Sequence, residues 1–183
     1  MALTATMYHF QITLSDVDRG VYEVLDLRVA RHPSETMRYL VTRTLAYCLS
    51  YEDGIAFSKA GLSSVEEAPL SVRDATGVLR AWIDIGSPSA ERLHKASKAA
   101  GKVLLFTHVE LPLLLREASA RAIHHVEQIE VYRFEAEFLD ALDQKLEKNS
   151  KFEVVRTDGQ LYVTIGGNTL NGTITPCSLV PSA

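Results

Sequence analysis

The chain opens with two segments in which apolar and polar residues alternate, and the polar link 15–20 separates them. The apolar positions are Tyr8, Phe10, Ile12 and Leu14 in the first segment and Leu25, Leu27 and Val29 in the second. Because a period of two places alternate side chains on one face of a strand, this pattern predicts an antiparallel hairpin with one buried face.

After the hairpin the apolar spacing changes to that of a helix. Pro33 and Ser34 are typical of a helix start, and apolar residues recur from Met37 to Leu49 at the spacing of a single helical face. We therefore expect a long amphipathic helix. From about Tyr51 to Asp74 the pattern dissolves among Gly, Ser and Pro, and a stretch of this length indicates a functional loop.

The second half of the chain combines strand and helix patterns. The segment from Val78 to Ile85 predicts a strand, and a helix opened by Ser87 and Pro88 leads to the apolar strand 103–106, which makes a strand–helix–strand crossover. Further helices are expected at 111–122 and 135–148, and further strands at 127–134, 152–156 and 161–165. The expected turns are Asp158-Gly159, Gly166-Gly167 and Asn171-Gly172.

Length and composition fit one globular α/β domain over 1–183, since 46% of the residues are apolar and 23% are charged. The two cysteines lie far apart and do not indicate a disulfide framework. With no basic leader and no run of about 20 apolar residues, we expect a soluble cytoplasmic protein without a membrane partner.

A net charge of −4 argues against a strong non-specific nucleic-acid binder, because such proteins need a positive field. A local basic groove stays open, since cationic residues crowd the middle third of the chain. They are Arg31, Arg38, Arg43, Arg73, Arg80, Arg92, Lys95 and Lys98. The alternative for most of them is a solvated face.

Two carboxylates attract attention by their predicted surroundings. Asp84 lies on the apolar strand 78–85, where an acid is costly unless it is paired or binds a metal, and Asp74 stands just before that strand. If the two converge, their oxygens could bind one Mg²⁺. The alternatives are that Asp74 shapes a turn with Gly77, and that Asp84 pairs with Arg80 or caps the next helix.

Three other candidates have simple structural explanations. Glu35 opens the first long helix, where a negative charge suits the helix dipole. Lys95 stands four residues after Glu91, which favours an exposed ion pair on a helix. The neighbouring His124 and His125 are not expected to bind one metal, because adjacent side chains diverge.

Several strings resemble, in the same order, those of the YaeQ family. They are Thr4-Ala-Thr-Met-Tyr8, Ala30-Arg-His-Pro-Ser-Glu-Thr36, Leu45-Ala-Tyr47, and Trp82-Ile-Asp-Ile-Gly86 with Lys95-Ala96. The resemblance covers essentially the whole chain. It implies a fold related to the PD-(D/E)XK nucleases, a restriction-endonuclease-like arrangement with a central mixed β-sheet flanked by helices and acids gathered at one end.

Carried over residue by residue, the resemblance makes Asp74 the first acid of the nuclease motif, Asp84 the second, and Glu35 an additional acid on the first helix. Gly86 stands where the motif has lysine, and Lys95 on the next helix could supply the missing ammonium group.

The activity implied is metal-assisted phosphodiester hydrolysis of a nucleic acid. The expected ligands of Mg²⁺ or Mn²⁺ are Asp74, Asp84 and Glu35. Lys95 would stabilise charge on the phosphorus, and Arg31 or Arg38 would hold a neighbouring phosphate. One alternative is a non-catalytic binding or regulatory module that keeps the fold, and another is a hydrolase of a different phosphate ester.

Overall fold

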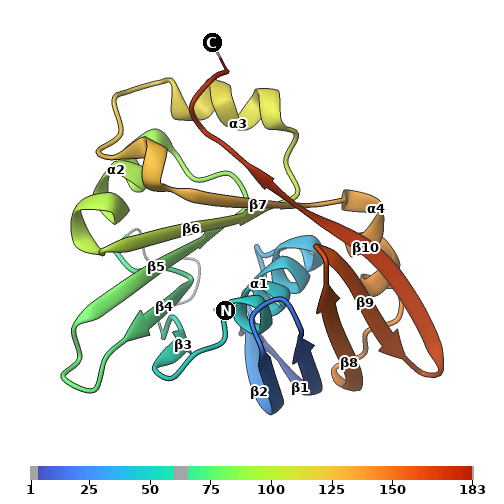
Figure 1. The fold of residues 1–183 in the computed structure, drawn as a ribbon. Helices are drawn as coiled ribbons and strands as arrows, with labels where there is room; N and C mark the ends of the chain where they lie inside the picture. Colours follow the sequence, from blue (N-terminus) through green and yellow to red (C-terminus); the bar gives the residue numbers. More distant parts are fainter. Residues whose placement is uncertain (1–3, 60–65, 183) are drawn as a thin grey trace. The chain divides into compact units, whose positions relative to one another are not determined.

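The computed structural model describes residues 4–59 and 66–182, in two compact units. The first unit comprises Met1–Tyr51 and Phe134–Ile174, and the second comprises Glu52–Arg133 and Thr175–Ala183. Both contain strands and helices, so the predicted α/β class is confirmed (Figure 1). The prediction of a single domain over 1–183 stays a prediction.

The first unit contains a mixed five-stranded sheet with the order β2-β1-β8-β9-β10. Its strands are β1 (Thr6–Asp16), β2 (Val21–Arg31), β8 (Asn149–Thr157), β9 (Gln160–Ile165) and β10 (Asn168–Cys177, of which the last three residues belong to the second unit). β1 pairs antiparallel with β2 and parallel with β8, and the pairs β8–β9 and β9–β10 are antiparallel. The expected hairpins near both ends of the chain are confirmed.

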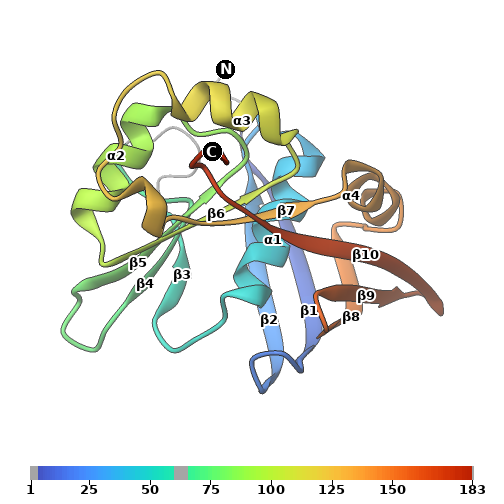
Figure 2. The ribbon, with the colours of Figure 1, turned by 45° about the horizontal axis from the view of Figure 1, so that its top comes forward.

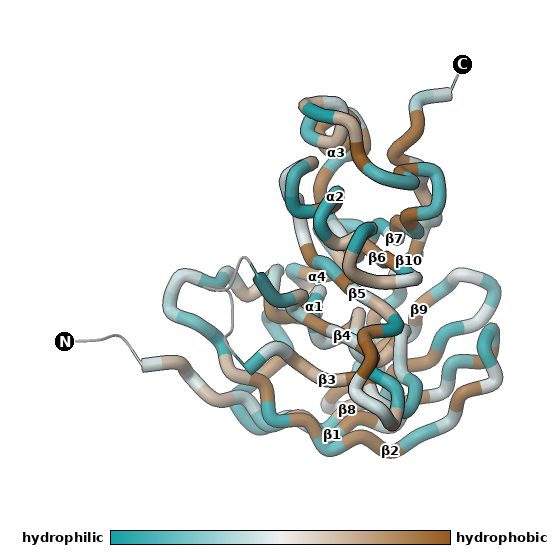
Figure 3. Tube along the Cα trace, turned by 90° about the vertical axis from the view of Figure 1, so that its left-hand side faces the viewer, coloured by the Kyte–Doolittle hydropathy of each residue, from teal (hydrophilic) through white to brown (hydrophobic). Residues whose placement is uncertain are grey.

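The alternation of apolar and polar residues in the sequence corresponds to an alternation of buried and exposed side chains in the strands. Phe10, Ile12 and Leu14 are buried on one face of β1, whereas the residues between them are exposed. The same alternation of hydropathy is visible along β1 and β2 (Figure 3). The two helices of this unit, α1 (Met37–Leu49) and α4 (Ala136–Asp143), contact each other. The Thr36 hydroxyl caps α1 by accepting from the Tyr39 amide at 3.2 Å.

The second unit contains a mixed sheet with the order β7-β6-β5-β4-β3. Its strands are β3 (Ile55–Phe57), β4 (Leu70–Arg73), β5 (Leu79–Ile85), β6 (Lys102–Thr107) and β7 (Glu130–Phe134, of which Phe134 belongs to the first unit). β3, β4 and β5 pair antiparallel, whereas β5, β6 and β7 pair parallel. The predicted crossover from β5 through α2 (Ala90–Ala99) to β6 is confirmed.

Helices α2 and α3 (Leu111–Ala118) lie on the same side of β5 and β6 (Figure 2), and a 3₁₀ turn, η2 (Val126–Gln128), leads into β7. Side chains from both helices pack with Trp82, Val103 and Leu105 in one apolar cluster. No helix in the described part of the chain is long and apolar enough to cross a membrane.

Several sequence expectations are wrong in detail. The helices expected at 111–122 and 135–148 end earlier, at Ala118 and Asp143, and the strand expected at 127–134 begins at Glu130. The stretch from Tyr51 to Asp74, expected to be a loop, contains β3 and β4, whose three and four residues are too few to show a period. Asn171 and Gly172 lie within β10 and do not form a turn. A Cβ at Gly172 would lie 2.5 Å from the Phe138 ring, so this glycine permits a close approach of helix and strand.

Candidate functional site

Asp74 organises the turn between β4 and β5. Its Oδ1 accepts hydrogen bonds from the Thr76 amide at 2.9 Å, the Thr76 hydroxyl at 2.6 Å and the Val78 amide at 3.0 Å, and its Oδ2 accepts from Arg80 Nε at 2.7 Å. These bonds, with that of the Thr76 hydroxyl foremost, lower the pKa of Asp74 to about 2. The carboxylate of Asp74 thus stabilises the turn. The Gly77 amide also donates to the Asp74 backbone carbonyl at 2.9 Å.

Asp84 is buried on β5 with only 2% of its surface exposed. Its Oδ2 accepts from Trp82 Nε1 at 3.0 Å and from Arg92 Nε at 2.7 Å, and its Oδ1 accepts from the Ile85 amide at 3.2 Å. The buried charge is therefore compensated by Arg92 on α2, and not by Arg80 as the sequence left open.

Asp74 and Asp84 lie at opposite ends of β5. Asp74 binds Arg80 at the start of the strand, and Asp84 follows Arg80 by four residues, which is about 13 Å at the rise of an extended strand. The two predicted metal ligands are thus not brought together.

Lys95 forms an ion pair with Glu66 and not with Glu91. The pairing of Leu70 with Ile83 brings the residues before β4 beside the Asp84 end of β5. Arg92 links the two segments, because its Nη2 donates to the Glu67 carbonyl at 2.9 Å while its Nε binds Asp84.

The remaining predicted residues lie in the first unit. Glu35 is 3% exposed, its Oε1 lies 2.9 Å from Arg43 Nη2, and its Oε2 accepts from the His32 amide at 3.1 Å. Burial raises the pKa of Glu35, and the Arg43 charge opposes that shift. Arg31 Nε donates to the Glu35 carbonyl at 2.9 Å. Glu35 and Arg31 are therefore in direct contact through the Glu35 carbonyl.

Arg38 is held by a bidentate ion pair with Asp140 on α4, with its Nε at 2.6 Å and its Nη2 at 2.7 Å from the two carboxylate oxygens. This pair connects α1 with α4. The fork of Arg38 is thus already used by a carboxylate, which is the geometry that would otherwise hold a phosphate.

The arrangement seen does not fit a Mg²⁺ or Mn²⁺ ion shared by Asp74 and Asp84. Their carboxylates are far apart. Asp74 is bound by Arg80 and two backbone amides, and Asp84 by Arg92 and the Ile85 amide. Within residues 4–59 and 66–182, no group of three or more His, Cys, Asp or Glu side chains is placed to hold a metal ion.

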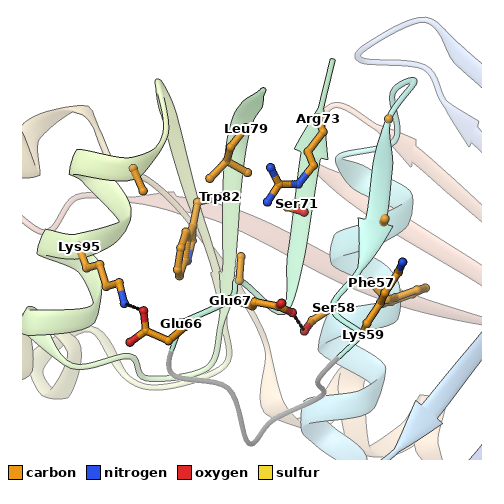
Figure 4. Close-up of a pocket in the computed structure, with 14 residues that line it drawn as sticks. Phe57, Ser58, Lys59, Glu66, Glu67, Ser71, Arg73, Leu79, Trp82 and Lys95 are labelled. Carbon is orange, nitrogen blue, oxygen red and sulfur yellow. Dashed lines mark hydrogen bonds and ion pairs between the residues drawn. The ribbon is translucent and has the colours of Figure 1, made fainter. Parts of the chain in front are cut away.

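A pocket of about 410 Å³ lies where β3, β4, β5 and α2 meet (Figure 4). Its charged lining combines three cations with two acids: Lys59, Arg73, Lys95, Glu66 and Glu67. Its apolar lining includes Phe57, Leu79 and Trp82, and its neutral polar groups are Ser58 and Ser71. Of the residues predicted from the sequence, Lys95 lines this pocket, and Asp84 lies next to it through its bond to Trp82.

Two contacts cross the rim of the pocket. One is the Lys95–Glu66 ion pair, and the other is the hydrogen bond from the Ser58 hydroxyl to Glu67 at 2.8 Å (Figure 4). A register shift at Val72 and Arg73 pairs Leu79 with Arg73 and so brings Leu79 to the pocket side together with Trp82.

A family model described as YaeQ protein matches residues 1–174 of the chain. The chain belongs to the YaeQ family. The "Uncharacterized protein YaeQ" of Escherichia coli (strain K12) is 34% identical over 108 residues, which is 59% of each protein, and that of Salmonella typhi gives the same values. The chain thus spans about three-fifths of the length of these curated relatives.

Two crystal structures of YaeQ proteins share the fold. That from Xanthomonas axonopodis pv. citri has a TM-score of 0.86 with 28% sequence identity, over 96% of this chain and 99% of the other. That from Pseudomonas syringae has a TM-score of 0.85 with 28% identity, over 95% and 96%. The YaeQ resemblance noted in the sequence is confirmed over nearly the whole chain.

The pocket of this chain contains two acids, Glu66 and Glu67, that the sequence analysis did not single out. Glu66 and Glu67 lie a few residues before β4, and Asp74 follows it. Only one end of this short strand can lie beside Asp84. In the antiparallel hairpin of β4 and β5, the end of β4 that lies beside Asp84 is the one preceded by Glu66 and Glu67. The acidic pair before Pro69 was the signal, but recognising β4 as a strand was needed to use it.

Proposed function

We propose that this YaeQ-family protein is a non-catalytic binding protein whose ligand brings an anionic group into the pocket of β3, β4, β5 and α2. The observation that carries the proposal is that Lys59, Arg73 and Lys95 line one pocket of about 410 Å³. Small-molecule sites typically enclose about 300–1,000 Å³ and combine apolar walls with a few polar groups.

The charge balance of the pocket supports an anionic ligand. Among the described residues that line it, three cationic side chains outnumber two acids by one. Glu67 accepts a hydrogen bond from Ser58, and Glu66 binds Lys95. Arg73 donates to the Gly77 carbonyl at 3.0 Å through Nη1, and within residues 4–59 and 66–182 its guanidinium has further donors that can reach a ligand.

The state of Asp84 supports binding rather than metal chemistry. A metal ion at Oδ2 of this carboxylate would have to replace the guanidinium of Arg92 and the indole N–H of Trp82, both of which already bind that oxygen. Removing one partner of a buried ion pair is costly. A shared fold does not by itself bring an activity with it.

A second candidate is metal-dependent phosphodiester hydrolysis by a nuclease-like site, with nucleic acid as the substrate. The observation that favours it is the clustering of Asp84, Glu67 and Lys95 around the same end of β5, with Arg92 linking Asp84 to the Glu67 backbone. A relationship to the PD-(D/E)XK nucleases belongs to this candidate.

Isothermal titration calorimetry with inorganic pyrophosphate tests the binding proposal. We expect saturable binding that Lys95→Ala weakens at least tenfold, since a charge-assisted hydrogen bond contributes roughly 1.5–3 kcal/mol. The matched control is Lys98→Ala, an exposed lysine of the same helix that does not line the pocket. Equal binding by both variants, or no binding by the wild type, would contradict the proposal.

The two candidates separate in a cleavage assay. The wild type is incubated with single-stranded and double-stranded oligonucleotides and Mn²⁺, and the binding proposal expects no cleavage above that of a protein-free control. Metal-dependent cleavage that disappears in Asp84→Asn would instead establish the second candidate.

A further inference from the structure

We infer that the ligand of this pocket is an aromatic phosphate of mononucleotide size, whose phosphate replaces the Glu66 carboxylate on Lys95. The inference rests on the proposed binding function and adds to it a ligand class and an internal competitor. Three features carry it: a rigid apolar wall, the distribution of cations, and the exposed position of the Lys95–Glu66 pair.

The apolar wall suits a flat ring. Trp82 is 3% exposed and is fixed from two sides, because its Nε1 donates to Asp84 and the Arg92 guanidinium lies 5.4 Å from its ring centroid. Leu79 and Phe57 extend this wall on β5 and β3. Rigid apolar walls lower the entropy that binding costs, and Leu79 and Phe57, which are partly exposed, offer contact area to a planar ring beside the fixed Trp82.

Small side chains leave room beside the wall. Ala56, Ala68 and Ala99 line the pocket together with the larger residues. At about 410 Å³ the space lies in the lower part of the range for small-molecule sites, so it suits a ligand of mononucleotide size.

The charges favour a phosphate over a single carboxylate. Lys59, Arg73 and Lys95 come from three different segments around the pocket, and Lys95 lies on the α2 side, away from Lys59 (Figure 4). A phosphate offers Lys95 more acceptor oxygens than a carboxylate and up to two negative charges. In the structure, Glu66 already gives Lys95 one carboxylate partner. A ligand with only one carboxylate would replace the Glu66 carboxylate by an equivalent group, so the exchange would add little binding free energy.

The Lys95–Glu66 pair is easily exchanged. Its side chains are 42% and 75% exposed, and solvent-exposed ion pairs contribute little to stability. Glu67 stays bound to the Ser58 hydroxyl, and the Ser58 amide donates to the Pro69 carbonyl at 3.0 Å, so the neighbouring rim can persist when Glu66 leaves. Glu66 therefore acts as a tethered competitor for the ligand phosphate.

The fluorescence of Trp82 reports binding directly, because it is the single tryptophan of the chain. We titrate the protein with AMP, with adenosine, which lacks the phosphate, and with inorganic phosphate, which lacks the ring. We expect AMP to bind at least tenfold more tightly than either part. Equal affinity for AMP and adenosine, or for AMP and phosphate, overturns the inference.

Variants of the competitor give the second readout. Glu66→Gln should tighten AMP binding three- to tenfold because Lys95 loses its internal partner, whereas Lys95→Ala should weaken it at least tenfold. The matched control is Glu91→Gln, an exposed glutamate of α2 outside the pocket, which should leave AMP affinity unchanged. Unchanged or weaker binding in Glu66→Gln contradicts the competitor.

The two levels of proposal fail differently. If neither pyrophosphate nor AMP binds, the proposed binding function falls, and the inference falls with it. If pyrophosphate binds in a Lys95-dependent manner but the ring and Glu66 have no effect, the binding function stands and only the ligand class and the competitor are lost.

Discussion

Replacing Arg92 by methionine should expose how strongly Asp84 depends on its ion pair. The substitution keeps much of the apolar length of the side chain and removes the hydrogen bonds to Asp84 at 2.7 Å and to the Glu67 carbonyl at 2.9 Å. It also removes the cation above the Trp82 ring. Asp84 would then be a buried carboxylate without a compensating charge.

The expected loss of unfolding free energy is about 3–5 kcal/mol, the usual cost of leaving one member of a buried ion pair alone. The double variant Arg92→Met with Asp84→Asn should lose clearly less, since the uncompensated charge is gone. Arg80→Met is the matched control. Arg80 pairs with Asp74 at the exposed end of the same strand, so its loss should cost less than about 1 kcal/mol.

Urea unfolding, followed by Trp82 fluorescence and by far-ultraviolet circular dichroism, gives the loss of unfolding free energy of each of the three variants relative to the wild type. The reasoning would be refuted if Arg92→Met were no less stable than Arg80→Met, or if the double variant lost as much as Arg92→Met alone. Either result would mean that Asp84 finds its compensation elsewhere.

Two further predictions concern the strands β3, β4 and β5 beside the pocket. In urea unfolding, Gly54→Ala should destabilise the protein far more than Gly77→Ala. Both glycines have positive φ, which costs an alanine about 1–2 kcal/mol, but only at Gly54 would the new Cβ clash with the Arg73 carbonyl oxygen, at 1.9 Å. Asp74 has its pKa lowered from 3.8 to about 2, foremost by the Thr76 hydroxyl, so its contribution to stability is present above pH 3.8 and lost as the pH falls through about 2. Asp74→Asn should remove this pH-dependent loss in an acid titration monitored by circular dichroism, and an unchanged acid profile would contradict the assignment.

The sequence alone determined most of the regular elements. Periods of two and of 3.6 predicted the β1–β2 hairpin, α1, and the crossover from β5 through α2 to β6, because a long element repeats its apolar positions often enough to be read. The strings around Pro33 and Trp82 also revealed the family. β3, β4 and β10 were missed: strands of three and four residues show no period, and Asn171-Gly172 indicated a turn at a place that lies within β10.

The composition of the site was decided by the tertiary structure. The sequence named Asp84 and Lys95 but could not give their partners, because Arg92 reaches Asp84 from the next helix and Glu66 reaches Lys95 from 29 residues away. It also named Asp74 as the acid that meets Asp84 and did not consider Glu66 and Glu67. The strand register instead places the segment of Glu66 and Glu67 beside Asp84, because an antiparallel hairpin brings together the strand ends that lie farthest from its turn.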